Sequence, residues 1–237
     1  MARNACSVLL VFLAVTVSAI QLPPSVTESH PPDLTWLLQN IEDVAHQNPA
    51  QARPYQVTRE YKVFRGNDRK PIAEITAQIN FEPPDVKTYK VTSSSGNKRG
   101  EMIVREILDL EVQSAKKTKG NDISRRNYDF AFLRRENFGV VPEYVLLIVP
   151  KRKEKYLLRG QIWVDANTFR VRRMEGSPAK NPSFWIAGIH LTLQFAELNG
   201  MWIPVSFDSI ATVRLFGQYT LAGRNIEAEN IPAPLKH

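Results

Sequence analysis

Carboxylates are the residues of this chain that could perform acid–base chemistry, because histidine and cysteine are scarce. A pair of carboxyl groups held a few ångströms apart can serve as general acid and general base. Asp165, Glu175 and Asp208 are the acids that invite this interpretation. Asp165 is explained as a turn residue before Ala166 and Asn167, and no regular spacing brings the other two acids together. We therefore predict that the protein is not an enzyme.

Metal and cofactor chemistry is also poorly supported by the residue types. The chain has 1 Cys and 4 His in 237 residues, which excludes an internal disulfide and a four-thiolate zinc site. It contains no P-loop, no glycine-rich dinucleotide motif, no nucleophile elbow and no His-Glu-x-x-His helix. We expect no metal and no cofactor.

The charge of the chain includes one dense basic run. The composition is that of an ordinary globular protein, with 43% hydrophobic and 23% charged residues, and the formal net charge is +7. Lys151, Arg152, Lys153 and Lys155 surround a single acid, Glu154. This loop either contacts anionic lipid headgroups or an acidic partner surface, or is simply solvated. No aromatic ladder is interleaved with the bases, so we expect no nucleic-acid partner.

The N-terminal segment has the pattern of a secretory signal peptide. Arg3 precedes a continuous apolar run at residues 8–15, and the small residues Val17-Ser18-Ala19 follow it. The run is shorter than the ~20 residues that span a bilayer. We predict a signal peptide at residues 1–19, a Pro-rich linker at 20–32 and a single domain at 33–237, exported to the periplasm. The alternative is a buried N-terminal helix.

Two segments of the predicted domain have helical periodicity. Apolar residues recur every three or four positions after Asp33, a possible N-cap, until Asn48-Pro49 stops the pattern. Residues 101–118 form a second amphipathic helix, with Gly120 just beyond it. Residues 121–137 contain either one short helix or an irregular loop.

The remaining sequence alternates apolar and polar residues with the period of strands. Three sequential strands follow the first helix, with a turn at 65–71 between the first two, and short turns make them antiparallel. Seven further strands follow residue 142 as an antiparallel meander. The predicted strands are 55–63, 75–81, 86–93, 143–149, 156–165, 169–175, 189–198, 201–207, 210–216 and 219–226.

The alternation gives each strand one apolar and one polar face. Ile189, Leu191, Leu193 and Phe195 share a face, and polar residues lie between them. Such a face needs a cover, which is either an ordinary core or an apolar ligand. Two helices are a thin cover for ten strands, so the sheet must curve strongly. We predict an α+β fold: an unclosed antiparallel β-barrel of about ten strands with helices on its concave side.

Two sequence motifs resemble a known family. The stretch at 156–176, with Trp163-Val164-Asp165 before a turn and Phe169-Arg170-Val171 after it, and the stretch Phe195–Pro204 resemble outer-membrane lipoprotein-sorting proteins of the LolA/LolB-like superfamily. The order of the elements fits as well, over roughly residues 33–227. The resemblance implies an unclosed barrel with helices packed into its mouth. Carriers of this family hold the helical lid with a single Arg, which cannot be assigned here from sequence.

The resemblance implies a function in lipoprotein transport. Carrier members enclose lipoprotein acyl chains, so we expect an acyl-binding periplasmic carrier that takes lipoproteins or lipids towards the outer membrane. Its partners would be the acyl chains, transiently a membrane, and an inner- or outer-membrane acceptor protein. Two alternatives remain: a lipid or lipoprotein sensor similar to MucB/RseB regulators, and a structural β-domain with no ligand.

The expected lipid-binding residues are the apolar inward positions of the strands and of the second helix. The helix residues Ile103, Ile107 and Leu108 would form the lid. The strand residues are Ile75, Ala77, Ile79, Phe81, Leu146, Ile148, Ile162, Val164, Leu191, Leu193, Phe195 and Val205. Lys151, Arg152, Lys153 and Lys155 are the expected headgroup or partner contacts.

Overall fold

The computed structural model describes residues 31–48, 50, 53–116 and 122–230. The predicted signal peptide and nearly all of the predicted linker lie outside the described residues. Within the described part, no helix is both long enough and apolar enough to cross a membrane. The same part contains no group of three or more His, Cys, Asp or Glu side chains arranged to hold a metal ion.

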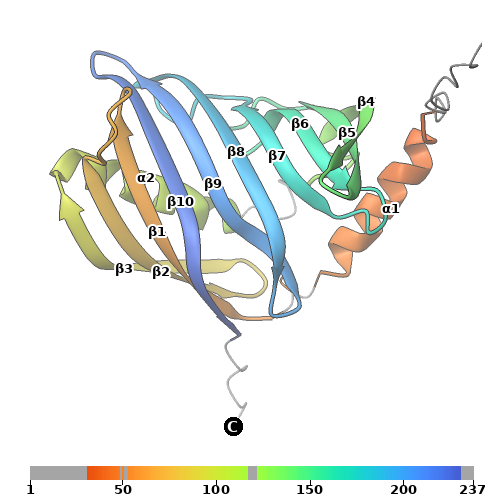
Figure 1. Ribbon diagram of the computed structural model, residues 1–237, viewed down its shortest axis with the longest axis horizontal. Helices are drawn as coiled ribbons and strands as arrows, with labels where there is room; N and C mark the ends of the chain where they lie inside the picture. Colours follow the sequence, from red (N-terminus) through yellow and green to blue (C-terminus); the bar gives the residue numbers. More distant parts are fainter. Residues whose placement is uncertain (1–30, 49, 51–52, 117–121, 231–237) are drawn as a thin grey trace, which may run out of the picture. The chain divides into compact units, whose positions relative to one another are not determined.

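The described residues form one ten-stranded antiparallel sheet (Figure 1). Its strand order is β3-β2-β1-β10-β9-β8-β7-β6-β5-β4, so β1 pairs with the last strand and the sheet is not closed between β3 and β4. The strands are β1 Tyr55–Arg65, β2 Ala73–Glu82, β3 Val86–Gly96, β4 Tyr128–Phe138, β5 Val141–Pro150, β6 Leu158–Asp165, β7 Val171–Pro178, β8 Ile186–Leu198, β9 Met201–Val213 and β10 Gly217–Asn230.

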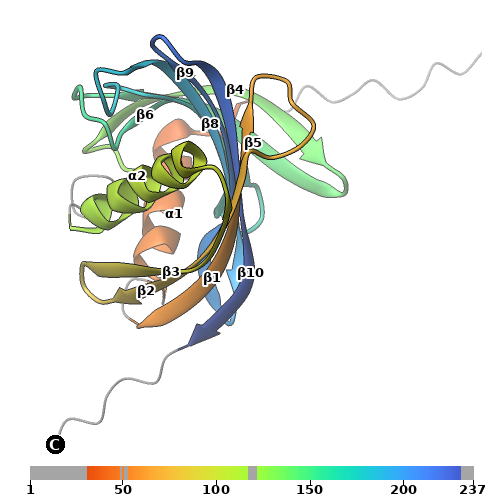
Figure 2. The same cartoon turned by 90° about the vertical axis from the view of Figure 1, so that its left-hand side faces the viewer.

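Two helices lie on the concave side of the sheet (Figure 2). Helix α1, Leu34–His46, has the predicted N-cap, because the Asp33 carboxylate accepts hydrogen bonds from the N–H groups of Thr35 and Trp36. Helix α2, Lys98–Ala115, begins three residues earlier than predicted, because Asn97 rather than a later residue caps it. The prediction of an α+β fold with an unclosed, curved antiparallel sheet is confirmed.

The strand count of ten is correct, but two segments were predicted wrongly: one strand was missed and another was predicted as two strands. Residues 128–138, expected to be a short helix or a loop, form β4. This edge strand pairs only with β5 and has few buried residues, so its sequence lacks a clear apolar face.

The two strands predicted at 201–207 and 210–216 are the single strand β9. Asp208 and Ser209 have turn-forming side chains, which suggested a break between two strands. In the structure Ser209 is buried opposite Leu221, and Asp208 pairs with Arg224 on β10.

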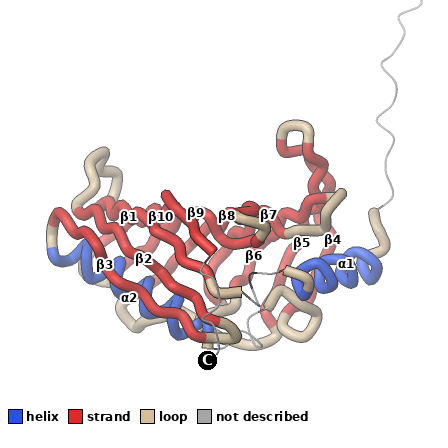
Figure 3. The backbone as a smooth tube through the Cα atoms, turned by 90° about the horizontal axis from the view of Figure 1, so that it is seen from below, coloured by secondary structure: helices blue, strands red, loops and turns tan. Residues whose placement is uncertain are grey.

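The core is divided into two clusters, one under each helix. Figure 3 shows these two helices at opposite ends of the sheet. The first lies between α2 and the strands β1, β2, β9 and β10, and includes Val57, Tyr61 and Ile75. The second lies between α1 and the strands β4 to β8, and includes Leu37, Ile41 and Leu146. The concave face is therefore covered separately at its two ends.

Candidate functional site

All of the predicted lipid-binding residues except Val205 belong to these two clusters or pack against them. Ile75, Ala77, Ile79, Phe81 and Leu108 are buried in the first cluster, with Ile103 and Ile107 packed against it. Leu146, Ile148, Ile162 and Val164 are buried in the second, with Leu191, Leu193 and Phe195 packed against it.

Val205 is half-buried and belongs to neither cluster. It is the extra residue at an irregularity where β8 and β9 change register between Gln194 and Phe195.

Between the clusters, the concave face of β8 and β9 has less cover. No residue of β8 is fully buried, although five strands separate it from one edge of the sheet and four from the other. Ile189, Leu191 and Leu193 on β8 and Phe207 on β9 are all half-buried. We call these four residues the apolar strip. It is an aliphatic and aromatic surface with partial access to solvent.

Helix α2 is held on the sheet by a buried charge cluster that the sequence analysis missed. Arg59 on β1 donates from Nη1 to Glu111 Oε2 on α2 at 3.0 Å, and Lys87 on β3 donates from Nζ to Glu111 Oε1, also at 3.0 Å. The exposed fractions of the Arg59, Lys87 and Glu111 side chains are 6%, 15% and 24%. One carboxylate thus joins the helix to two strands.

The surroundings of this charge cluster complete its hydrogen bonds. Arg59 Nε donates to Asn225 Oδ1 at 2.7 Å, and Asn225 in turn donates to the carbonyl of Pro204. A cavity of about 10 Å³, room for roughly one water, lies between these charges and the aliphatic side chains of Val57, Ile79 and Ile203. This cavity is too small to admit an acyl chain.

The charges of the cluster fix one another's protonation states. Burial alone would raise the pKa of Glu111, but the charges of Arg59 and Lys87 and their hydrogen bonds outweigh it and lower the pKa to about 2. Burial alone would lower the pKa values of Arg59 and Lys87, and the Glu111 carboxylate raises both. All three groups are charged near neutral pH.

A sequence signal for the charge cluster exists in the phase of each element. Arg59 occupies an inward position of β1, between Val57 and Tyr61, which are both buried. Lys87 has the same phase as Tyr89 and Val91 on β3. Glu111 follows the buried Leu108 by three residues, on the face of α2 that contacts the sheet. Charged residues at inward positions mark the site.

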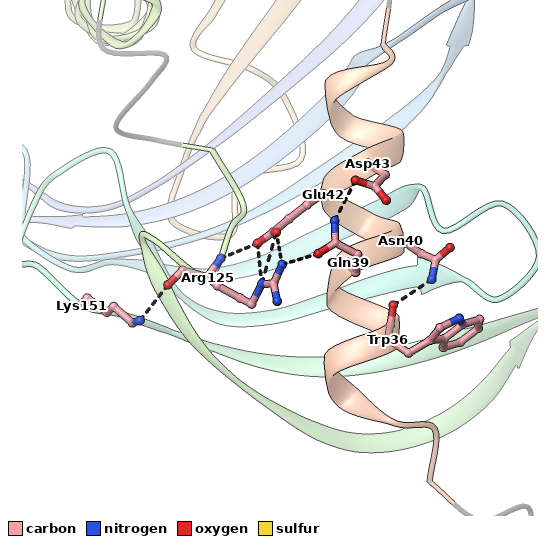
Figure 4. Close-up of polar contacts among 7 residues, drawn as sticks. All are labelled: Trp36, Gln39, Asn40, Glu42, Asp43, Arg125 and Lys151. Atoms are coloured by element: carbon pink, nitrogen blue, oxygen red, sulfur yellow. Dashed lines mark hydrogen bonds and ion pairs between the residues drawn. The ribbon is translucent and has the colours of Figure 1, made fainter.

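Helix α1 is held by a second, more exposed set of polar contacts (Figure 4). Arg125, in the connection before β4, donates its main-chain N–H to Glu42 Oε1 at 2.8 Å and its Nη2 to Glu42 Oε2 at 2.7 Å. The same Nη2 reaches Gln39 Oε1 at 2.7 Å. The hydrogen bond from Arg125 lowers the pKa of Glu42, against the effect of burial.

We expect replacement of Glu42 by glutamine to loosen α1 without unfolding the sheet. Amide exchange in α1 should become roughly two- to fivefold faster, as expected for an exposed ion pair. Because the pKa of folded Glu42 is lowered, its contribution is present above about pH 4.5 and fades as pH falls below that value. Hydrogen-exchange mass spectrometry measures this effect. Asp43→Asn makes the same change of charge on α1 and keeps an oxygen that can accept from Gln39 Nε2, so it is the control and should leave exchange nearly unchanged.

The basic loop predicted at 151–155 connects β5 to β6 and is partly tied down. Lys151 Nζ donates to the carbonyl of Arg125 at 2.7 Å, and Lys155 Nζ donates to Gln113 Oε1 on α2 at 3.0 Å. Arg152 pairs with Glu154. Lys153 is exposed and makes no ion pair with a described acid. The loop therefore contacts α2 and the connection that holds α1.

The three candidate carboxylates contact different groups and do not pair with one another. Asp165 Oδ1 accepts from the main-chain N–H groups of Asn167 and Thr168, as expected for a turn residue. Glu175 on β7 contacts His190, and Asp208 on β9 pairs with Arg224. Each acid has its own structural partner.

Comparison with known proteins gives matches among solved structures only. No protein-family model matches the sequence, and no curated protein matches it. A LolA superfamily protein from Nitrosomonas europaea is 12% identical, with a TM-score of 0.39, over 84% of this chain and 94% of that chain. A putative outer membrane lipoprotein-sorting protein domain from Vibrio parahaemolyticus is 14% identical, with a TM-score of 0.44, over 84% and 94% of the two chains.

A third match is to a chain in the complex of MucA and MucB from Pseudomonas aeruginosa. It is 10% identical, with a TM-score of 0.27, over 84% of this chain and 99% of that chain. These TM-scores are all below 0.5, so the fold is assigned from the strands and helices themselves. One unclosed antiparallel sheet with two helices on its concave side is the architecture that the sequence resemblance implied.

Proposed function

We propose that the protein is an exported carrier that binds the acyl chains of lipoproteins or lipids on the concave face of its sheet. The observation that carries this proposal is the apolar strip, a half-buried surface on two central strands between two separately covered cores. An acyl chain with about fourteen methylenes costs roughly 11 kcal/mol to expose to water, at ~0.8 kcal/mol per methylene. A partly uncovered apolar surface is therefore a place where such a chain gains cover.

The acyl chain would first contact the apolar strip, where Leu191 and Leu193 have partial access to solvent. Movement of α2 would extend this surface onto the buried faces of β1 and β2. Helix α2 suits such a movement, because only Gly100, Val104 and Leu108 of its residues are fully buried. Much of its attachment is polar, through Glu111 and through Asp109, which accepts from the Tyr89 hydroxyl at 2.9 Å.

Titration with a long-chain fluorescent fatty acid tests the proposal on the exported protein. We expect saturable binding, and we expect Leu193→Asn to weaken it at least tenfold, because a polar side chain on the strip removes apolar contact with the chain. The control is Ile210→Asn, which changes an exposed apolar residue of the adjacent strand that is not part of the strip.

Two outcomes would contradict the carrier function. The first is an absence of saturable probe binding to the folded protein, which would favour a structural domain without a ligand. The second is equal loss of binding in Leu193→Asn and Ile210→Asn, which would mean that the strip is not the binding surface. Thermal unfolding of both variants shows whether they are folded.

A further inference from the structure

Four large apolar side chains are exposed together at one end of the sheet. Phe184 and Trp185, in the connection from β7 to β8, have exposed fractions of 77% and 54%; Leu215 and Phe216, in the turn from β9 to β10, have 91% and 42%. These two connections lie along the upper edge of the sheet in Figure 1. We call the four residues the apolar tip.

Hydrogen bonds join the two connections into one surface. Arg214 donates its main-chain N–H to the carbonyl of Trp185 at 2.7 Å, and its Nε donates to the carbonyl of Phe184 at 3.0 Å. The rings of Phe184 and Trp185 pack edge to face, 5.7 Å apart. The exposed rings are thus held by the backbone of both connections.

Leu215 has a backbone conformation that is unusual for leucine. Its φ is +66°, in the left-handed region that a leucine adopts at a cost of about 1 kcal/mol or more, where glycine or asparagine would fit without strain. The side chain gains no burial in return, since it is the most exposed of the four. Burial within the described residues does not explain a large apolar side chain in this place.

Cations surround the apolar tip. The guanidinium of Arg214 lies 5.2 Å from the ring centre of Phe184, and that of Arg99, at the start of α2, lies 4.5 Å from the ring centre of Phe216. Aromatic side chains beside basic ones are the combination found at the boundary between a bilayer and water. The tip has this combination on both of its connections.

The whole end of the sheet that carries the apolar tip is basic. Because the strands are antiparallel, the residues at this end are the connections 66–72, 122–127, 151–157, 179–185 and 214–216, together with Asn97 and the first two residues of α2, Lys98 and Arg99. They contain twelve Lys or Arg and three acids. The described connections at the opposite end contain two bases, Arg53 and Arg170, and one acid, Asp85. The positive charge is therefore concentrated at one end.

We propose that this end of the sheet docks on a bilayer that carries anionic headgroups, with the apolar tip at the interface. Each base near such a surface contributes about 1 kcal/mol, and the charge of the surface is complementary to that of the twelve bases. The apolar strip begins at Ile189 on β8, four residues after Trp185, which lies just before this strand. If the proposed acyl binding holds, a docked protein presents the strip directly to the lipids.

Vesicle flotation tests the docking with protein purified from the cell envelope, with the N-terminus that it has there. We expect binding to vesicles of phosphatidylcholine with phosphatidylglycerol, at least tenfold weaker binding to phosphatidylcholine alone, and release by salt. Phe184→Ser/Trp185→Ser/Leu215→Ser should bind anionic vesicles at least tenfold more weakly. Phe138→Ser/Val140→Ser is the control, because these large apolar residues are also exposed but lie at the opposite end.

Trp185 also reports its own position. Anionic vesicles should shift its emission to shorter wavelength, and this shift should be missing in Trp185→Phe. Unfolding midpoints of the tip variant should match the wild type, since its residues are exposed. Fatty-acid binding by the tip variant should persist, so a failure of docking and a failure of acyl binding are distinguishable.

Three results would overturn the docking proposal. They are the absence of binding to anionic vesicles, equal binding by the wild type and the tip variant, and equal binding to neutral and anionic vesicles. Capture of one envelope protein by the wild type but not by the tip variant, with no vesicle binding, would assign the apolar tip to a protein partner instead.

Discussion

Glu111→Gln is expected to lower the free energy of unfolding at pH 7 by about 3 kcal/mol, because it leaves Arg59 and Lys87 buried beside a neutral group. The lowered pKa leads to a similar figure. A change in the pKa of Glu111 from the ordinary 4.5 to about 2 corresponds to about 3 kcal/mol of interaction, at about 1.4 kcal/mol per unit of pKa. Urea unfolding followed by circular dichroism measures the loss.

The matched control for this variant is Glu106→Gln on the same helix. Glu106 is exposed, and its replacement makes the same change of charge away from the buried cluster. We expect its effect on the free energy of unfolding to be less than about 0.5 kcal/mol. A loss of equal size in both variants would mean that the net charge of α2, and not the buried contact, determines the stability.

The pH dependence of the same contact has a definite sign. Because the pKa of Glu111 is lower in the folded protein than in the unfolded chain, its contribution is complete above about pH 4.5. It is lost as the pH falls from there to about 2. The difference in stability between the wild type and Glu111→Gln should therefore shrink over this range. A difference that stays constant down to pH 2 would contradict the assignment.

Much of the fold follows from the sequence because the strand alternation is regular. The inward positions of β2, Ile75, Ala77 and Ile79, are all buried, as their two-residue period predicts. The edge strand β4 could not be predicted in the same way, because one face of an edge strand has few neighbours and needs few apolar residues. The buried Ser209 concealed the continuity of β9 for a related reason, since a small polar residue inside a sheet looks like a turn.

The candidate site was predictable only in part. Apolar periodicity identifies which residues face inward, but it does not show which of them are covered by other side chains, so Ile75 and Leu191 look alike in sequence. In the structure the first is 1% exposed and the second is half-buried. This difference depends on where the two helices lie, and the pairing of Arg59 with Glu111 depends on it as well, across fifty-two positions of sequence.

Removing all the charges from the buried cluster should not destabilise the protein as removing one of them does. In Arg59→Met/Lys87→Met/Glu111→Leu, apolar side chains of similar volume replace a cluster whose desolvation cost is high. The free energy of unfolding is then expected to be equal to that of the wild type or higher by about 1–4 kcal/mol. Urea unfolding tests this directly against Glu111→Gln.

The apolar replacement should also slow the loading of acyl chains, if α2 moves during binding. When α2 leaves the sheet, the charges of Arg59, Lys87 and Glu111 regain their hydration, which offsets part of the lost contact. Apolar side chains at the same positions regain nothing and expose additional apolar surface to water. The open state is then less populated, and we expect the association rate of a fluorescent fatty acid to fall at least tenfold. Stopped-flow mixing measures this rate. An unchanged association rate in a variant of higher stability would mean that α2 stays in place and that the chain binds on the apolar strip alone.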